Sequence, residues 1–395
     1  MMGMPRHIWL LVIGTVINVT GASFLWPLNT IYMHNELGET LAFAGFILML
    51  NQAASIAGNL IGGILFDKFS PYKTILYGTG LAVASAITLS FFHGILSYAI
   101  LLILIGFGAG ITWPVMFAMA GSVWPEGGRR AFNAIYVAQN LGVALGATIG
   151  GYVASISFNY IFIANAFLFT VFFILALVTF KDMDQERDRQ MHTTVLNQSR
   201  EIKDKSAFKA LFILCSGFLV TWLAYSQWQS TIASHTQDIG IALEQYSTLW
   251  AINGFLIVLG QPLVKWVTGK IKSPKKHIYV GNAILITSFA VVMFAEDFTM
   301  FAVSMVILTV GEMLVWPAFP TLANELAPKG RMGFYQGLVN SIAAAGRMLG
   351  PVLGGFIVDI YNIELLFFIL LFILFTPFVT TYFYDRKVKK EEQTV

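Results

Sequence analysis

The sequence predicts an all-α membrane protein in which twelve transmembrane helices form two parallel six-helix repeats. Three observations predict this fold class: a low content of charge, apolar runs of membrane-spanning length, and motifs that recur in the second half of the chain. Of the 395 residues, 57% are apolar and 11% are charged, whereas a soluble domain carries about 25% charged residues. So few charges indicate a surface that faces lipid.

Apolar runs of about 20 residues, the length that crosses ~30 Å of hydrocarbon, recur along the whole chain. We expect spans at 8–30, 42–66, 74–93, 96–121, 131–155, 159–180, 208–230, 246–268, 278–295, 299–323, 333–357 and 362–384. The one long polar segment, at 181–206, is mixed in charge and lacks the apolar residues of a core, so it is compatible with an amphipathic surface helix but not with a separate folded domain. We therefore expect a six-helix half at 1–180, a solvated cytoplasmic linker at 181–206, and a second half with a short tail at 207–395.

The distribution of lysine and arginine predicts the orientation. If both termini are cytoplasmic, every lysine and arginine except Arg347 lies in an expected cytoplasmic segment. The opposite loops then carry acids such as Glu36, Asp238 and Glu296. We therefore expect an integral protein of the cytoplasmic membrane with both termini inside.

Three motifs of the first half recur in the second half, in the same order and at nearly constant spacing, which is typical of an internal repeat. They are the Gly-x4-Trp-Pro segments at 108–114 and 311–317, the Thr-Ile-x2-His segments at 30–34 and 231–235, and the glycine stripes Gly142, Gly146, Gly150 and Gly346, Gly350, Gly354. Glycines four residues apart let two helices approach closely in lipid. We expect these stripes, with Pro351, to be helix-packing surfaces rather than ligand sites. An even number of spans in each half makes the repeats parallel.

The loop between the second and third expected spans reads Gly63-x3-Asp67-Lys68-x4-Lys73. This loop resembles the cytoplasmic signature of the major facilitator superfamily, and the resemblance extends over essentially the whole chain. The run at 136–141 before Gly142, and a glutamate in the tenth span, are similar to the drug/proton antiporter group. The resemblance implies the major facilitator fold and proton-driven transport of a small molecule. Because no nucleotide-binding loop is present, we expect no use of ATP.

The chain differs from that antiporter group at three positions. Ala147 stands where a proline is usual, although Gly350-Pro351 has the usual form in the eleventh span. Leu102 replaces an arginine of the fourth span, and Ile135 replaces an acid of the fifth. These differences concern proton coupling and leave the fold prediction unchanged.

Glu312 and Arg347 are the ionisable residues expected near the middle of a span. A charge at the bilayer centre costs from ~3 to more than 10 kcal/mol, so such residues face the protein interior or a watery cavity. One interpretation makes Glu312 the proton acceptor and the counter-ion of a cationic substrate, with Arg347 in substrate binding or coupling. The alternative is a structural Glu312–Arg347 ion pair between neighbouring helices.

Asp67 is the second acid to which we assign a role. The resemblance implies that Gly63, Asp67, Lys68 and Lys73 form a conformational latch, in which Asp67 pairs with a helix end or a basic residue when the cytoplasmic side is closed. The alternative is an ordinary loop salt bridge, worth ~0–1 kcal/mol.

Aromatic and amide side chains on six of the expected spans predict the walls of a substrate cavity. They are Trp26, Trp113, Tyr136, Gln139, Asn140, Gln227, Trp228, Trp316, Gln336 and Asn340. Aromatic faces beside one acid suit flat lipophilic cations. The alternative for each tryptophan is packing or an interfacial aromatic belt.

These observations favour a proton-driven exporter of hydrophobic or cationic drugs. The alternative is a transporter of an endogenous solute such as a sugar, peptide or glycolipid. We find no metal-ligand cluster and no nucleophile–base set, so we expect neither an enzyme nor a cofactor or metal. The expected partners are a small-molecule substrate, protons and membrane lipid, without nucleic acid, and we expect a monomer.

Overall fold

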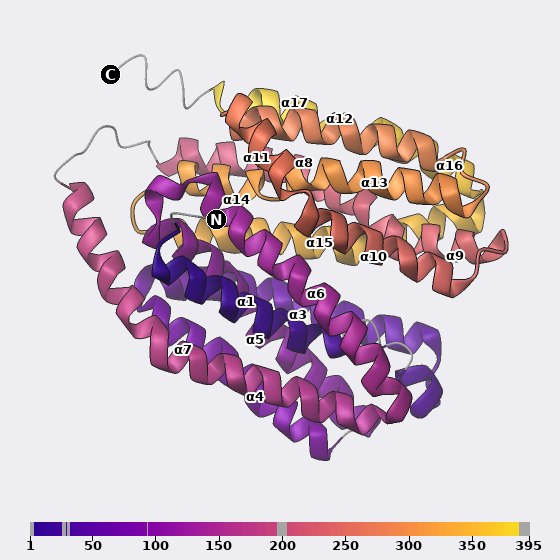
Figure 1. Ribbon diagram of the computed structural model, residues 1–395, viewed down its shortest axis with the longest axis horizontal. Coiled ribbons are helices and arrows are strands. Elements are labelled where there is room, and N and C mark those ends of the chain that lie inside the picture. The colour runs from indigo at the N-terminus through magenta and orange to yellow at the C-terminus, as the bar shows by residue number, and fades with distance from the viewer. Residues whose placement is uncertain (1–3, 26–28, 30–31, 93, 196–203, 387–395) are drawn as a thin grey trace. The chain divides into compact units, whose positions relative to one another are not determined.

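The computed structural model describes the chain apart from residues 1–3, 26–28, 30–31, 93, 196–203 and 387–395 (Figure 1). All regular elements of the described residues are helices. The chain divides into two compact units, residues 1–199 with 329–341 and residues 200–328 with 342–395.

The first unit is built from six long helices. They are α1 (Arg6–Leu25), α3 (Leu41–Lys68), α4 (Pro71–Phe91), α5 (Ile95–Val123), α6 (Arg129–Ile156) and α7 (Phe158–Val195), with the short η2 (Tyr32–Glu36) and η3 (Pro125–Gly127) between them. The side chains of Thr40 and Ser70 cap α3 and α4, because each accepts a hydrogen bond from a backbone N–H three residues later. These caps separate apolar runs that would otherwise continue one another.

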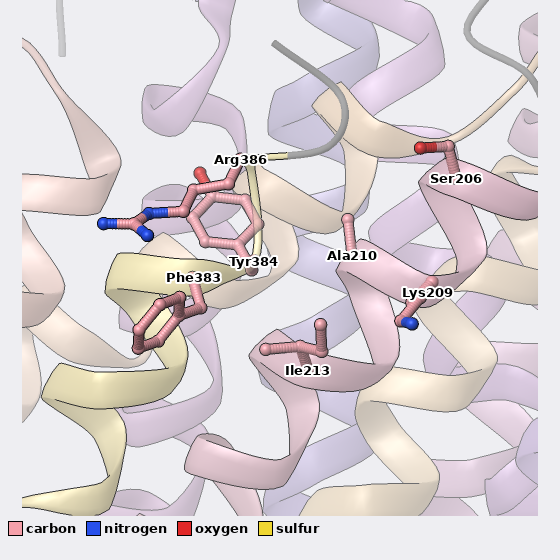
Figure 2. A pocket seen from close by; sticks show the side chains of 7 residues that line it. All are labelled: Ser206, Lys209, Ala210, Ile213, Phe383, Tyr384 and Arg386. Carbon is pink, nitrogen blue, oxygen red and sulfur yellow. The ribbon is translucent and has the colours of Figure 1, made fainter. Parts of the chain in front are cut away.

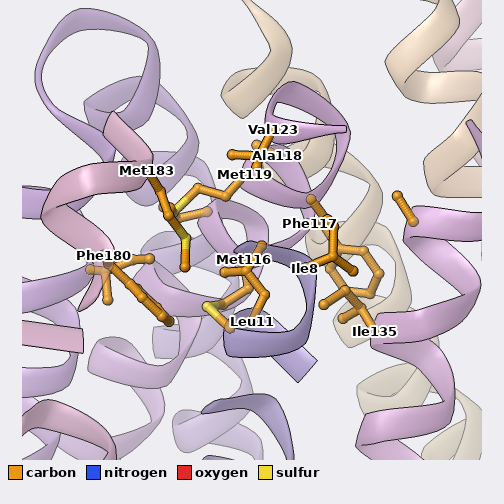
Figure 3. Close-up of a cluster of buried hydrophobic side chains, with 14 of the residues drawn as sticks. Ile8, Leu11, Met116, Phe117, Ala118, Met119, Val123, Ile135, Phe180 and Met183 are labelled. Carbon is orange, nitrogen blue, oxygen red and sulfur yellow. The ribbon is translucent and has the colours of Figure 1, made fainter. Parts of the chain in front are cut away.

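A cluster of buried apolar side chains holds α1, α5, α6 and α7 together (Figure 3). Ile8 and Leu11 of α1 meet Met116 of α5 and Phe180 of α7 in this cluster. The methionine side chains fill the irregular spaces between the aromatic rings. This cluster is the core of the first unit at the end where α1 begins.

The second unit contains more helices because several of its expected spans are broken. They are α8 (Asp204–Tyr225), η4 (Ser226–Gln229), α9 (Thr231–Asp238), α10 (Leu243–Leu259), α11 (Gln261–Lys270), α12 (Pro274–Val292), α13 (Phe298–Val315), α14 (Ala318–Leu326), α15 (Met332–Ile360), α16 (Ile363–Ile373) and α17 (Thr376–Phe383). The break between α13 and α14 falls at Trp316-Pro317, where proline lacks the N–H that a continuous helix needs. The first residues of α15, up to Ser341, belong to the first unit.

Corresponding helices of the two units have the same neighbours. In the first unit α5 packs on α3 and α4, and α7 packs on α1 and α4. In the second unit α13 packs on α10 and α12, and α17 packs on α8 and α12. The repeat predicted from the motifs is therefore present in the packing of the helices.

Ten helices of the described residues are long and apolar enough to cross a membrane, or eleven if the pair α10 and α11, bent by 54°, is one span. The remaining expected span corresponds to α12, whose first turn contains Lys275, Lys276 and His277. These residues lower the mean hydropathy of the helix. The predicted fold class, an all-α membrane protein, is confirmed.

Helix α7 extends beyond its expected span, to Val195. Residues 181–195 contain neither glycine nor proline and are rich in aspartate, glutamate, glutamine and arginine. Without a helix breaker, the helix of the membrane segment continues into this polar stretch. The first part of the predicted linker is thus helical, and 196–203 lie outside the described residues.

The two glycine stripes face the first long helix of their own unit. In the first unit, a Cβ atom at Gly142, Gly146 or Gly150 would overlap α1. In the second unit, a Cβ atom at Gly346 or Gly350 would overlap α8 and the following η4. Only glycine therefore permits these helix pairs to approach so closely.

Gly350→Ala should lower the stability of the protein by about 1–3 kcal/mol, because its new methyl group would overlap Ser226 and the Leu223 carbonyl. Gly355→Ala, on the same helix, is the matched control, since a Cβ atom there meets no other atom within 4 Å. The control should be neutral or slightly stabilising, because alanine favours helix. Thermal unfolding of the two purified variants measures the difference, and equal unfolding temperatures would contradict the close-packing interpretation.

Candidate functional site

Glu312 is buried in the second unit, with 1% of its surface exposed. Asn253 of α10 donates a hydrogen bond from Nδ2 to Oε1 of Glu312 over 2.7 Å. The same amide nitrogen lies 2.9 Å from Oγ1 of Thr309, one turn before Glu312 on α13. The phenol of Tyr225, near the end of α8, also interacts electrostatically with the Glu312 carboxyl. The neighbouring helices α8 and α10 thus bring polar groups to one buried acid of α13.

Aromatic rings connect this acid to Arg347. The ring of Tyr225 lies 5.1 Å from that of Trp316, and Trp316 stacks on Trp222 with 4.8 Å between ring centroids. The guanidinium carbon of Arg347 lies 4.7 Å from the Trp222 ring centroid, a cation–π contact. The aromatic–acid cluster consists of Trp222, Tyr225, Asn253, Thr309, Glu312, Trp316 and Arg347. It unites Glu312, Trp316 and Arg347, which the sequence analysis selected separately.

The chemistry of the cluster follows from its polar groups and its apolar aromatic rings. The amide and phenol donors stabilise an ionised carboxylate, whereas the apolar surroundings favour the neutral acid. The indole faces attract a planar cation, as the position of Arg347 illustrates. A group of this composition can therefore exchange a proton and can hold an organic cation.

Four members of the cluster are absent from the sequence-based predictions: Trp222, Tyr225, Asn253 and Thr309. An ionisable residue such as Glu312 stands out in an apolar run, whereas neutral amides and phenols do not. Asn253 nevertheless had a signal, because it is the one amide in the apolar run from Leu249 to Leu259.

The side chain of Asp67, near the end of α3, contacts the start of α15 within the first unit. Its two carboxylate oxygens accept hydrogen bonds from the backbone N–H groups of Gly333 and Phe334, both over 2.7 Å. One turn earlier on α3, a Cβ atom at Gly63 would overlap the backbone of Gly333. The carboxylate therefore caps a helix from outside, and it also meets the positive end of that helix dipole.

The basic residues of the same loop lie at its surface. Lys68 ends α3 and Lys73 lies in the first turn of α4, both with exposed side chains. The backbone N–H of Lys73 donates to Oγ of Ser70 over 3.2 Å. Ser70 thus serves as the cap of α4.

The predicted cavity residues of the first unit lie on α5, α6 and the start of α15. Trp113, Gln139 and Asn140 are half-buried, and Tyr136 is buried. Gln336 is buried and Asn340 half-buried. The amides of Asn140 and Asn340 each donate over 2.9 Å to the carbonyl four residues earlier in their own helix. Trp26 lies outside the described residues.

Gln227 and Trp228 are fully enclosed in η4. The amide nitrogen of Gln227 donates to the carbonyl of Gly350 over 2.8 Å, and its oxygen accepts from the Thr231 hydroxyl over 2.6 Å. The ring of Trp228 packs edge-on against Phe301. These contacts join η4 to its neighbours.

Two positions at which the chain differs from drug/proton antiporters carry apolar core residues. Ile135 is fully buried in the cluster of Figure 3. Leu102 is buried in a second apolar cluster with Tyr98 and Ile105. At both positions an apolar side chain fills the space inside the unit.

A duplicated bundle of membrane-spanning helices around a buried carboxyl is the architecture of a membrane transporter. The family model of the Major Facilitator Superfamily matches residues 11–351 and 218–395. A Bacillus subtilis protein described as the uncharacterized MFS-type transporter YttB is 54% identical over 392 residues, which is 99% of this chain and 98% of the relative. The chain belongs to the Major Facilitator Superfamily, whose members are transporters rather than enzymes.

More distant similarities extend over most of the chain. The multidrug resistance protein MdtH of Aeromonas salmonicida is 24% identical over 361 residues, covering 90% of this chain and 88% of that protein. The crystal structure of the human organic anion transporter MFSD10 superimposes with a TM-score of 0.75 at 12% identity, covering 96% of this chain and 100% of that one. This structural similarity concerns the fold alone.

Asn253→Leu should destabilise the protein by about 1–3 kcal/mol, because it removes a hydrogen-bond donor from the buried Glu312 carboxyl. In a Glu312→Gln background the same substitution should cost less, since a neutral amide is cheaper to leave unpaired than a carboxylate. Thermal unfolding of the two single variants and the double variant measures this coupling. Strictly additive losses would show that the hydrogen bond does not connect the two residues energetically.

Proposed function

We propose that the protein is a proton-coupled exporter of hydrophobic, cationic compounds, as in the drug/proton antiporter group, working by alternating access. The observation that carries the proposal is the buried Glu312 carboxyl beside the Tyr225 and Trp316 rings. The name of the MdtH relative, a multidrug resistance protein, supports the transport of drugs.

Competition for one carboxylate is sufficient for antiport. A substrate cation favours the ionised form of Glu312, and burial in an apolar site favours the protonated form. Proton and substrate then displace each other as the site faces alternate sides of the membrane. Moving one charge through ~150 mV yields roughly 3.5 kcal/mol, which sustains a gradient of a few hundredfold.

Arg347 favours a second candidate function. A guanidinium on the Trp222 face repels a cation and attracts a carboxylate or phosphate. If Arg347 remains there during transport, the site suits an endogenous solute such as a peptide, sugar or glycolipid better than a cationic drug. A role of Arg347 in coupling, or as a static partner of Glu312, is tested by the same experiments.

We propose that Asp67 and the start of α15 form the conformational latch of the cytoplasmic side, with Gly63 allowing the close approach and Lys68 and Lys73 flanking it. The contact consists of two charge-assisted hydrogen bonds at a helix end, which form or break as a unit. In this proposal the moving halves are residues 1–180 and 207–395, and both termini are cytoplasmic. We propose that the predicted cavity residues, Trp26 included, line the substrate path.

Glu312→Gln should abolish uphill export of a lipophilic cation such as tetraphenylphosphonium, because an amide cannot exchange the coupling proton. Proteoliposomes with an imposed pH gradient measure accumulation, which should fall from a few hundredfold at most to unity. Glu364→Gln removes a charge from the exposed first turn of α16 and serves as the matched control. Undiminished accumulation of the cation by Glu312→Gln would show that Glu312 does not couple transport to protons.

Thermal stabilisation across a panel of cations, peptides and sugars separates the two candidate functions. The first candidate predicts that lipophilic cations stabilise the native protein and that Glu312→Gln loses this response. Stabilisation by a peptide or sugar alone, lost in Arg347→Gln, would favour the second candidate.

Asp67→Ala should slow transport about fivefold, since loss of a helix cap costs ~1 kcal/mol and shifts the latch toward its open form. Binding of the substrate should stay unchanged, because Asp67 lies outside the aromatic–acid cluster. Initial rates in proteoliposomes, with Asp182→Ala at an exposed site of α7 as the control, measure the effect. An unaltered transport rate in Asp67→Ala would show that the contact is an ordinary loop interaction and not a latch.

A further inference from the structure

A cavity of about 580 Å³ opens between α8 and the end of α17 in the second unit (Figure 2). It is lined by Ser206, Lys209, Ala210, Ile213, Phe383, Tyr384 and Arg386. None of these residues belongs to the aromatic–acid cluster. The cavity lies where one membrane-spanning segment begins, at Lys205, and another ends, at Phe383.

The charge available in this cavity is positive. Lys209 and Arg386 have exposed side chains on its two sides. The acid next to Arg386 in the sequence, Asp385, is engaged by Lys275, whose Nζ lies 2.7 Å from Oδ1 of Asp385. The guanidinium of Arg386 packs on the rings of Tyr382 and Phe383, 4.2 Å and 4.6 Å from their centroids.

Ser206 adds a polar group that lacks a partner. Its Oγ atom is buried and makes no hydrogen bond to any part of the chain that the structure describes. Figure 2 shows this hydroxyl on the side of α8 that faces the gap toward Arg386. A buried hydroxyl without a partner is unfavourable, so its presence in a basic cavity indicates an absent acceptor.

An apolar groove adjoins the cavity. It is lined by Tyr279 of α12 and by Phe378, Val379, Tyr382 and Phe383 of α17. Phe383 is shared between the groove and the basic cavity, and 46% of its surface is exposed. A ligand that fills both would have an anionic head and an apolar chain.

We infer that the basic cavity binds the headgroup of an anionic phospholipid. The phosphate lies between Lys209 and Arg386 and accepts a hydrogen bond from Ser206, while an acyl chain follows the groove along Tyr382 and Phe383. The apolar groove distinguishes a lipid from a free phosphate, because a soluble anion leaves that surface uncovered. Basic pockets between transmembrane helices on the cytoplasmic side bind anionic headgroups in this way. The lysine and arginine distribution assigns this end of α8 and α17 to that side.

Binding of lipid to the purified full-length protein tests the inference without transport. Dioleoylphosphatidylglycerol should raise the unfolding temperature more than dioleoylphosphatidylcholine, which has the same chains and no net charge. Lys209→Gln/Arg386→Gln should weaken the apparent affinity for the anionic lipid about 30-fold, since it removes two basic contacts. Native mass spectrometry of retained lipid gives a second readout, in which Ser206→Ala should retain less anionic lipid even if the double variant folds poorly.

Lys272→Gln/Lys276→Gln is the matched control, because it removes two exposed charges that do not line the cavity. Its response to the anionic lipid should equal that of the unaltered protein. An equal loss in this control, or an undiminished response in Lys209→Gln/Arg386→Gln, would overturn the inference. So would equal stabilisation by the two lipids. Stabilisation by glycerol 1-phosphate as strong as that by the anionic lipid would identify a soluble phosphate instead.

Discussion

The cost of placing a charge in hydrocarbon is the constraint on which the rest of this structure depends. An ionised carboxyl at that depth has to find its partners inside the protein, and the partners of Glu312 come from different helices: Asn253 from α10 and Tyr225 from α8. Those helices must therefore pack closely around α13. A site with this requirement is also a site that responds to a proton or a cation, because either one changes the charge that must be compensated.

Asp67, near the end of α3, is a second acid whose charge is compensated within the protein, but by a different kind of donor. Asp67 accepts hydrogen bonds from two backbone N–H groups at the start of α15. Backbone donors at a helix end are fixed in direction, so this contact depends on the position of a whole helix. A salt bridge between flexible side chains would tolerate a shift of α15, whereas this cap does not. The Asp67 hydrogen bonds therefore form only when the start of α15 is in this position.

The sequence was sufficient for those parts of the structure that depend on local pattern. Apolar runs located the spans, because length and hydropathy are properties of a segment. The partners of Glu312 were not predictable in this way. Asn253 and Glu312 are 59 residues apart, and their contact depends on how α10 and α13 are rotated about their axes. The extension of α7 to Val195 was missed because polarity was taken as the sign of a linker, whereas the absence of helix breakers decided the backbone.

The position of the glycine stripes has a consequence for biogenesis. Each stripe packs on the first long helix of its own repeat, so α1 meets its partner surface only after α6 has left the ribosome. That surface is complete before any helix of the second repeat has been synthesised. The early segments can therefore associate in the bilayer during translation, and the later segments can insert beside a preassembled neighbour. A gene divided between the repeats and expressed as two polypeptides would keep both of these pairings intact.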